Sequence, residues 1–338
     1  MSKNQLTPKG YESILDLRET EKAIKLIKDF FEKKLAEKLN LQRVSAPRFV
    51  KKGTGINDDL SGKERKVSFN IKYNPKINAE IVFSLAKWKR MALRDYGFRI
   101  EEGLYTDMDA IRPDEEVLDN LHSVYVDQWD WERVIKKEDR NLDFLKNIVK
   151  KIYKTIKETE KMIHKKYPEI KPILPKNITF LSTKDLIDKH LNLKPKQRED
   201  KITEKYGAVF LIGIGRDVNG NIIHDERAPD YDDWTLNGDI IFWNPVIRKS
   251  FEISSMGIRV DRNALIRQLK ITHNENRMGL EWHKRLLAGE FPESVGGGIG
   301  QSRLCMFFLR KAHIGEVQSS LWSDEVRDYC KKNNINLL

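Results

Sequence analysis

Segments that alternate between apolar and polar residues lie on both sides of a lysine-rich stretch with helical periodicity, and this order most limits the fold. Before that stretch, residues 121–132 alternate as a β-strand does. After it, residues 207–215, 238–245 and 250–260 are typical of strands. Because the strands cluster instead of alternating regularly with helices, they favour an antiparallel sheet over a doubly wound parallel one. We expect one α+β domain with a central, mostly antiparallel sheet flanked by helices.

The remaining segments supply helices and further strands. Apolar spacing and turn residues predict a helix over 20–39, a strand interrupted by Pro47, a hairpin of strands 65–73 and 79–85 around a turn at 74–78, helices over 86–97, 261–270 and 280–289, and a long helix after Gly300. Gly97 is expected to end its helix, because glycine readily adopts the left-handed conformation found there. Pro47 confines its strand to a sheet edge or a bulge, because proline lacks a backbone N–H.

Most of the net charge of +11 comes from residues 133–205, where 21 Lys and Arg stand against 11 Asp and Glu, a net of +10. Such a charge indicates either nucleic-acid binding or the solvated faces of amphipathic helices. The segment also has an apolar stripe at helical spacing, formed by Leu142, Leu145, Val149, Ile152, Ile156 and Ile163. We interpret it as a basic helical insert within a single domain over 19–338, after an extension over 1–18. We expect no nucleic-acid partner.

The composition argues against a membrane or secreted protein. Apolar runs are short, and the N-terminal residues lack the apolar core of a signal peptide. The two cysteines, Cys305 and Cys330, offer no disulfide framework and fit a reducing compartment. We expect a cytoplasmic protein with no membrane partner.

The stretch GGGIGQSR, which begins at Gly296, has glycines and an arginine at a spacing suited to an anion. It is not a P-loop, which requires a lysine, nor a dinucleotide fingerprint, which has a third glycine where Arg303 stands. In a loop, Gly298 and Gly300 would let the backbone approach a ligand closely, and the guanidinium of Arg303 would bind the anion. The alternative is a plain turn at the start of a helix.

Polar side chains stand at positions of the predicted strands where apolar ones are expected. Gln128 and Asp130 continue the apolar face of one strand, Asp239 begins the next and Glu252 lies on a third. Because buried acids need partners and Mg²⁺ prefers carboxylate oxygens, Asp239 and Glu252 could share a magnesium ion. The alternative is that these residues are ordinary exposed strand ends.

Arg112 adds a second arginine to Arg303, and it precedes a proline and an acidic run. Two arginines beside a carboxylate pair indicate a nucleoside triphosphate site without a P-loop, because guanidinium groups and Mg²⁺ neutralise the charge on phosphate oxygens. The pattern therefore predicts nucleotide-dependent chemistry.

Three segments together resemble the motifs of class II aminoacyl-tRNA synthetases: FFEKKLAEKLNLQRVSAP resembles motif 1, IRPDEEVLDNLHSVYVDQWDWE motif 2 and GGGIGQSRLCMFF motif 3. Longer segments resemble the ammonia-dependent asparagine synthetases, namely DDLSG at 58–62, SLAKWKR at 84–90, EGLYTDMDAIRPDEE at 102–116, LHSVYVDQWDWERV at 121–134, RAPDYDDW at 227–234, LNGDIIFWNPV at 236–246, FEISSMGIRVD at 251–261, and GGGIGQSRL to HIGEVQSSLW at 296–322. The resemblance implies the synthetase fold, a homodimer, and synthesis of L-asparagine from L-aspartate, ammonia and ATP. It also implies a β-aspartyl adenylate intermediate, with AMP and pyrophosphate as products.

The resemblance further implies roles for individual residues. For ATP and its Mg²⁺, it implies Arg112 at the α-phosphate, Arg303 at the γ-phosphate and adenine, Gly298 and Gly300 beside the nucleotide, and Asp239 and Glu252 at the metal. For aspartate, it implies Arg259 and Lys89 at the α-carboxylate, Gln128 and Asp130 at the ammonium, and Ser84, Asp232 and Ser255 elsewhere on the substrate. Asp58 would capture ammonium and remove a proton from it, unless it is a turn residue.

Other functions are less well matched. One alternative is a truncated aspartyl- or asparaginyl-tRNA synthetase that charges tRNA, but that family carries an anticodon-binding domain before motif 1, and its absence here argues against this interpretation. A non-catalytic RNA-binding paralogue would be expected to have lost groups such as Arg112 and Arg303, which are present. A glutamine-dependent synthetase needs an N-terminal catalytic cysteine, whereas this sequence begins Met-Ser. The resemblance departs near Val126, where the related tRNA synthetases have a phenylalanine that stacks on adenine, so the stacking partner stays open.

Overall fold

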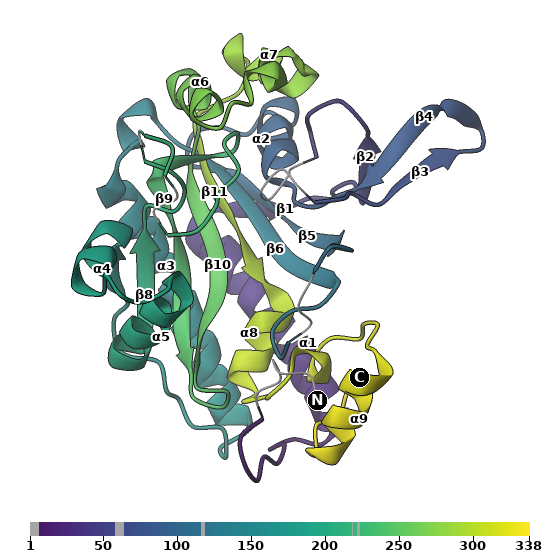
Figure 1. The fold of residues 1–338 in the computed structure, drawn as a ribbon, viewed down its shortest axis with the longest axis vertical. Coiled ribbons are helices and arrows are strands. Elements are labelled where there is room, and N and C mark those ends of the chain that lie inside the picture. Colours follow the sequence, from purple (N-terminus) through teal and green to yellow (C-terminus); the bar gives the residue numbers. More distant parts are fainter. Residues whose placement is uncertain (1–6, 58–63, 116–118, 218, 222–223) are drawn as a thin grey trace.

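The computed structural model describes residues 7–57, 64–115, 119–217, 219–221 and 224–338 and contains one large sheet (Figure 1). Its strand order is β1 (Leu41–Arg43), β5 (Gly103–Ile111), β6 (Tyr125–Val134), β11 (Ser294–Gly300), β10 (Lys249–Arg259), β9 (Asp232–Asn244), β8 (Ala208–Ile212) and β7 (Thr179–Ser182). Neighbouring strands are antiparallel, except at the two edges, where β1 pairs with β5 and β7 with β8 in parallel. The predicted α+β fold with a mostly antiparallel sheet is confirmed.

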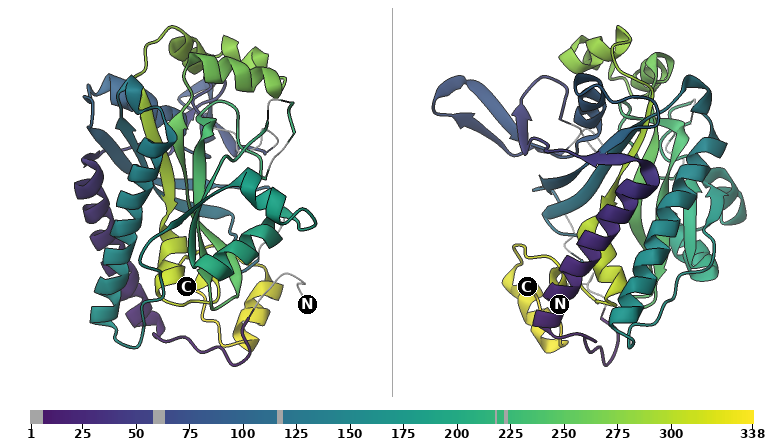
Figure 2. Two further views of the ribbon diagram at one scale, coloured as in Figure 1. Left: turned by 90° about the vertical axis from the view of Figure 1, so that its left-hand side faces the viewer. Right: turned by 180° about the vertical axis from the view of Figure 1, so that it is seen from behind.

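Helices cover both faces of this sheet. The long helices α1 (Leu17–Leu39) and α3 (Leu142–Lys166) lie side by side on one face, with α8 (Gln301–Phe308), and share the largest apolar core with Trp129 of β6 (Figure 2). On the opposite face, α2 (Ala86–Asp95) packs over Leu104 and α5 (Pro195–Tyr206) packs over Ile241. Because successive strand residues point to opposite faces, Gln128 and Asp130 lie on the side of α2 and α5.

The remaining helices are shorter: α4 (Thr183–Lys189), which packs beside β7 and β8, α6 (Arg262–Ile271), α7 (Glu281–Leu287) and α9 (Asp324–Lys332), with 3₁₀ turns η1 (Lys137–Asp139), η2 (Glu275–Gly279) and η3 (Ile314–Glu316). Helices α6 and α7 lie beside α2 at one end, and α9 lies at the other end (Figure 1). In the part of the chain that the structure describes, no helix is long and apolar enough to cross a membrane.

The strand expected around Pro47 is interrupted there and lies at sheet edges, as predicted: β1 is an edge of the large sheet, whereas β2 (Phe49–Lys51) is an edge of a second, three-stranded sheet, where it pairs with β4. In that sheet β3 (Ser68–Ile71) and β4 (Asn74–Ile81) form the hairpin, whose turn lies at residues 72–73 and not at 74–78. The hairpin projects from the body of the molecule as an arm (Figure 1).

The basic segment over 133–205 is part of the main core. The apolar stripe of α3 is buried against α1, and the lysines of α3 lie mostly on its exposed side. The segment also provides β7, which extends the sheet. The described part of the expected extension packs on the core as well, because Tyr11 is buried and its hydroxyl donates to the Glu316 carboxylate at 2.9 and 3.0 Å.

Candidate active site

The glycine-rich stretch forms strand β11 between β6 and β10, so the prediction of a loop there was wrong. Gly296 is paired with Glu132 and Gly298 with Asp130. A Cβ on Gly296 would lie 2.6 Å from Arg259 Nη2, and one on Gly298 would lie 2.7 Å from Asp130 Oδ1. Such contacts are too close for any side chain. The glycines therefore leave space on the sheet for polar side chains of the neighbouring strands.

Two adjoining cavities, of about 300 and 210 Å³, occupy this space on the α2 and α5 face. Their shared lining residues are Arg112, Gln128, Asp225, Glu252, Ser255 and Gly298. Of the other predicted site residues, Gly300 and Arg303 line only the first cavity, and Ser84, Lys89, Asp130, Asp232, Asp239 and Arg259 line only the second. The fold thus gathers these residues from distant parts of the chain. Asp58 lies outside the described residues.

The first cavity brings the guanidinium groups of Arg112 and Arg303 close together. Burial lowers the pKa of Arg112, and the positive charge of Arg303 lowers it further. Arg112 Nε is buried without a hydrogen-bond partner in the described chain. Arg303 Nη1 donates to the backbone oxygen of Glu252 at 3.0 Å, which directs its side chain along the cavity wall. Two neighbouring cations, one with an unsatisfied donor, suit an anionic ligand.

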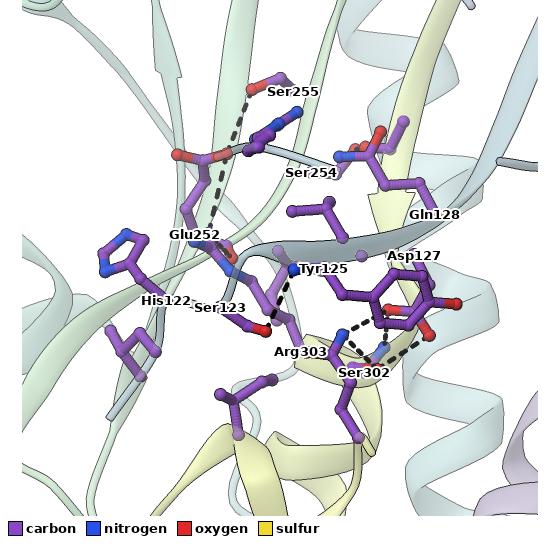
Figure 3. Close-up of a pocket in the computed structure, with 18 of the residues that line it drawn as sticks. His122, Ser123, Tyr125, Asp127, Gln128, Glu252, Ser254, Ser255, Ser302 and Arg303 are labelled. Carbon is purple, nitrogen blue, oxygen red and sulfur yellow. Dashed lines mark hydrogen bonds and ion pairs between the residues drawn. The ribbon is translucent and has the colours of Figure 1, made fainter. Parts of the chain in front are cut away.

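The N-terminus of α8, next to this cavity, is already occupied by a carboxylate of the protein. Asp127 of β6 accepts from the backbone N–H of Ser302 at 3.0 Å and from its hydroxyl at 2.8 Å (Figure 3). Lys28 of α1 pairs with the same carboxylate at 3.1 Å. An anion in the cavity would therefore be bound by Arg303, on the next residue of the helix, more than by the helix terminus.

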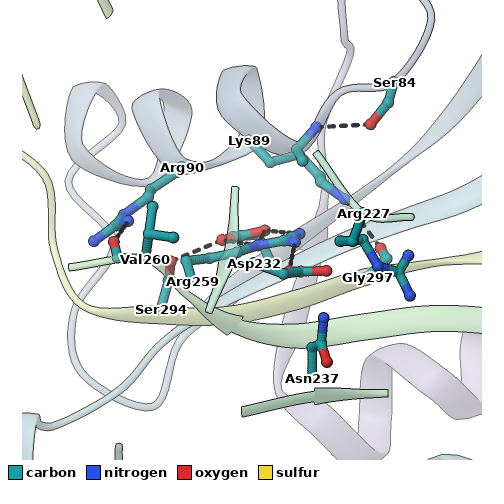
Figure 4. A network of polar contacts seen from close by, with 12 residues as sticks. Ser84, Lys89, Arg90, Arg227, Asp232, Asn237, Arg259, Val260, Ser294 and Gly297 are labelled. Carbon is teal, nitrogen blue, oxygen red and sulfur yellow. Dashed lines mark hydrogen bonds and ion pairs between the residues drawn. The ribbon is translucent and has the colours of Figure 1, made fainter. Parts of the chain in front are cut away.

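In the second cavity, Arg259 is held between two buried carboxylates (Figure 4). Its Nη1 donates to Asp232 Oδ1 at 2.5 Å, and its Nη2 donates to Glu132 Oε2 at 2.7 Å. Burial alone would lower the pKa of Arg259, but Glu132 and Asp232 raise it above its ordinary value. Ser294 also donates to Glu132 at 2.7 Å. This network fixes the guanidinium at the cavity wall.

Lys89 of α2 reaches the same cavity. Its ammonium donates to the backbone oxygen of Gly297 at 3.0 Å and lies 3.4 Å from Asp130 Oδ1. The side chain is buried, and that burial lowers the pKa of Lys89. The cavity thus offers cations for a carboxylate ligand, from Lys89 and Arg259, and a carboxylate for an ammonium ligand, from Asp130.

Asp239 of β9 and Glu252 of β10 both line the second cavity and are close enough to influence each other. Burial, and secondly the charge of Glu252, raises the pKa of Asp239 to about 6, although Arg227 donates to Asp239 Oδ1 at 2.5 Å. The alternative that Asp239 is an exposed strand end is wrong, because it is buried in the middle of β9.

The described residues contain no group of three or more potential metal ligands. Mg²⁺ usually takes one or two carboxylates and completes its shell with water and phosphate, so this pair fits it.

A family model described as aspartate-ammonia ligase matches residues 18–334. The aspartate–ammonia ligase of Clostridium perfringens strain 13 is 59% identical over 331 residues, which cover 98% of each chain. That of Bacteroides thetaiotaomicron is 55% identical over 342 residues, which cover 98% of this chain and 99% of the relative. The chain belongs to the aspartate–ammonia ligase family. Its membership confirms the family resemblance of the sequence and the prediction of a ligase that makes asparagine.

Solved structures place the aspartate–ammonia ligase fold among the class II tRNA synthetases. Asparaginyl-tRNA synthetase from Pyrococcus horikoshii, complexed with asparaginyl-adenylate, has a TM-score of 0.65 at 17% identity, covering 90% of this chain and 70% of that one. Aspartyl-tRNA synthetase from Entamoeba histolytica has a TM-score of 0.58 at 17% identity, covering 88% and 58%. At such identities the likeness concerns the fold alone, and it confirms the predicted fold class.

Several residues of the two cavities and their supporting contacts were not predicted from the sequence of this ligase. Glu132 holds Arg259, Arg227 holds Asp239, and Lys196 of α5 lines the first cavity near Glu252. Glu132 carried a usable signal, because it continues the polar strand face of Gln128 and Asp130. Lys196 was missed because it lies in the basic segment over 133–205, where no local pattern distinguishes it from the lysines on the surface.

Proposed function

We propose that this member of the aspartate–ammonia ligase family activates the β-carboxylate of L-aspartate with ATP and then transfers the β-aspartyl group from AMP to ammonia. The products would be L-asparagine, AMP and pyrophosphate, with a β-aspartyl adenylate as the intermediate. The observation that carries this proposal is the pair of adjoining cavities, one lined by the guanidinium groups of Arg112 and Arg303 and the other by groups that match aspartate. Activation is needed because the charge of a carboxylate repels nucleophiles.

Nucleotide chemistry would take place where the two cavities meet. Arg112 lines both, so it would neutralise the α-phosphate as the carboxylate attacks it. Arg303 lies farther along the first cavity and would bind the γ-phosphate and the adenine region, with Gly298 and Gly300 beside them. Asp239 and Glu252 would hold Mg²⁺, which supplies further charge neutralisation on the phosphates. In such transfer, positioning and electrostatics contribute most of the catalysis.

Aspartate would be oriented by charge within the second cavity. Arg259 and Lys89 would bind its α-carboxylate, and Asp130 with Gln128 would bind its ammonium. The β-carboxylate would then point toward Arg112 and the nucleotide. Ser84 and Ser255 would add hydrogen bonds from the cavity wall.

Ammonia needs a group that binds ammonium and accepts a proton. We retain Asp58 as the candidate, although it lies outside the described residues. Asp232 is the second candidate, but its Oδ1 already accepts from Arg259.

We also propose a cytoplasmic location, because Cys305 and Cys330 are free thiols in the structure.

The nucleotide products test this function most directly. Incubation with aspartate, ammonium and Mg-ATP should yield AMP and pyrophosphate in step with asparagine, as measured by anion-exchange chromatography. Glutamine in place of ammonium should give no asparagine, and omission of aspartate should leave ATP intact. Formation of ADP and phosphate would replace the adenylate with an acyl phosphate and refute the proposed mechanism.

We further propose a symmetric homodimer built on the motif 1 elements. Strand β1 is an edge of the large sheet, and apolar side chains are exposed near it: Tyr96 and Ile100 in the segment between α2 and β5, and Ile111 at the end of β5. Edges and apolar patches of this kind are usually covered by a partner. Light scattering at micromolar concentration should give twice the mass of the 39.6 kDa chain. An active monomer would contradict the proposal.

A further inference from the structure

Asp230 lies in the loop between Arg227 and Asp232, which line the second cavity, but its own side chain lines neither cavity. The side chain is fully buried. Its Oδ2 atom lies 2.9 Å from Lys87 Nζ of α2, 2.9 Å from His283 Nε2 of α7 and 3.0 Å from Arg277 Nη1 of η2. We call these four residues the Asp230 cluster.

Helix α2 connects the Asp230 cluster to the second cavity. Residues two apart on a helix are about 200° apart around its axis, so Lys87 and Lys89 project in nearly opposite directions. Lys87 reaches Asp230, whereas Lys89 reaches the backbone oxygen of Gly297 and the Asp130 carboxylate. Both lysines are buried. Any movement of α2 relative to Asp230 would therefore move Lys89 relative to the rest of the cavity.

The loop that contains Asp230 connects to the opposite wall. Asp232, two residues farther along, accepts from Arg259 at 2.5 Å. Gln268 of α6 holds the loop from behind, since its Nε2 donates to the backbone oxygens of Pro229 and Asp232, both at 2.9 Å. Asp230 is thus the point at which the loop, α2 and the α6–α7 layer are joined.

The contacts that hold the loop, α2 and α7 together depend on the negative charge of the Asp230 carboxylate. Burial would raise the pKa of Asp230, but Lys87, His283 and Arg277 lower it well below the ordinary value, so Asp230 stays ionised. Burial lowers the pKa of His283, so its imidazole is neutral near pH 7. Two buried or nearly buried cations therefore share this anion. A neutral side chain at position 230 would remove that shared charge and weaken the contacts of the loop with Lys87 and Arg277.

We propose that Asp230 is a positioning residue for L-aspartate, which sets the separation between Lys89 on one wall of the second cavity and Asp232 with Arg259 on the other. The identity of the ligand rests on the proposed function. Arg303, on the nucleotide side, belongs to α8, which contributes no residue to the Asp230 cluster. The effect of Asp230 should therefore fall on aspartate far more than on ATP.

Steady-state kinetics of Asp230→Asn test this proposal. We expect the KM for aspartate to rise about tenfold or more while the KM for ATP changes within about twofold, because displacements of about 1 Å in a site cost on the order of 10²-fold. Glu290→Gln is the matched control, since Glu290 pairs with Arg285 at 2.9 Å on the surface of the same region. This control should leave both KM values unchanged.

A second variant keeps the test decisive if Asp230→Asn does not fold. Lys87→Met retains the apolar stem near Trp282 and leaves Asp230 with Arg277 and His283, so a smaller rise in the aspartate KM is expected. An equal rise in both KM values, or a lower melting temperature with both KM values unchanged, would reduce Asp230 to a structural residue and overturn the proposal.

Two different measurements test the proposed function and the positioning role of Asp230. A wild-type enzyme that forms no asparagine would refute the proposed function. The positioning role would be refuted separately, by a folded Asp230→Asn variant that binds aspartate, in titration calorimetry, as tightly as the wild type does.

Discussion

Arg112→Ala is expected to lower the turnover number by on the order of 10²–10³-fold at saturating substrates, the usual loss when one donor to developing charge is removed. The guanidinium of Arg112 lines both cavities, and its buried Nε has no hydrogen-bond partner in the described chain. Its hydrogen-bonding capacity is therefore directed at a ligand. The local strand contact uses the backbone N–H of Arg112, which donates to Val124 at 2.7 Å, and the variant keeps it. The fold should survive.

Two comparisons sharpen this test. Arg303→Ala should also reduce turnover and should raise the KM for ATP, because Arg303 lines only the first cavity. Arg94→Ala is the control, since Arg94 is a partly exposed arginine of α2 that pairs with Asp95 and Glu290. Circular dichroism should show the same fold for all three. Near wild-type turnover of a folded Arg112→Ala variant would remove this residue from the mechanism.

Arg259→Met is expected to lower the free energy of unfolding by about 3–5 kcal/mol, the usual cost of breaking a buried ion pair by removing one partner. The loss arises because Glu132 and Asp232, whose side chains are almost completely buried, would remain without the cation between them. Activity should be lost as well, since Arg259 lines the cavity proposed for aspartate. Denaturant unfolding and asparagine formation measure the two effects.

The double variant Arg259→Met with Glu132→Met separates stability from function. Replacing both members of a buried pair by apolar residues is often nearly neutral, so the double variant should regain part of the stability that Arg259→Met loses. It should not regain activity, because the group that binds the α-carboxylate is still missing. Recovery of asparagine synthesis together with stability would show that Arg259 only holds the fold.

Patterns within single segments were sufficient to predict most elements of this fold. The apolar stripe of α3 repeats at helical spacing and is buried as predicted, since one face of a helix must pack on the core. Helix α1 was predicted over 20–39 and begins three residues earlier, at Leu17, where the Asp16 side chain accepts from the N–H of Glu19. The long segments shared with asparagine synthetases were sufficient to predict the family.

The partners of the charged residues could not be predicted in this way. Arg259 was predicted to bind substrate, but its two partners could not be named. Glu132 lies 127 positions from Arg259 in the sequence, and Asp232 lies 27 positions from it. Which side chains meet depends on strand order and register, and neither leaves a local pattern in the sequence. Arg227 was missed for a related reason: it lies in the loop before β9, and the fold of that loop, which brings it to Asp239 12 positions later, leaves no local pattern either.

The fold class, the family and the kinds of side chain available for the site could all be inferred from the amino-acid sequence. The role of the β11 glycines could not, because it depends on which strands lie beside them. A glycine run does not specify a strand, because glycine has no Cβ and its backbone can adopt loop conformations as readily as extended ones. Pairing of β11 with β6 and β10 selected the strand, and the missing side chains became the space that Glu132, Asp130 and Gln128 occupy. That choice depends on neighbours that the chain brings together only when it folds.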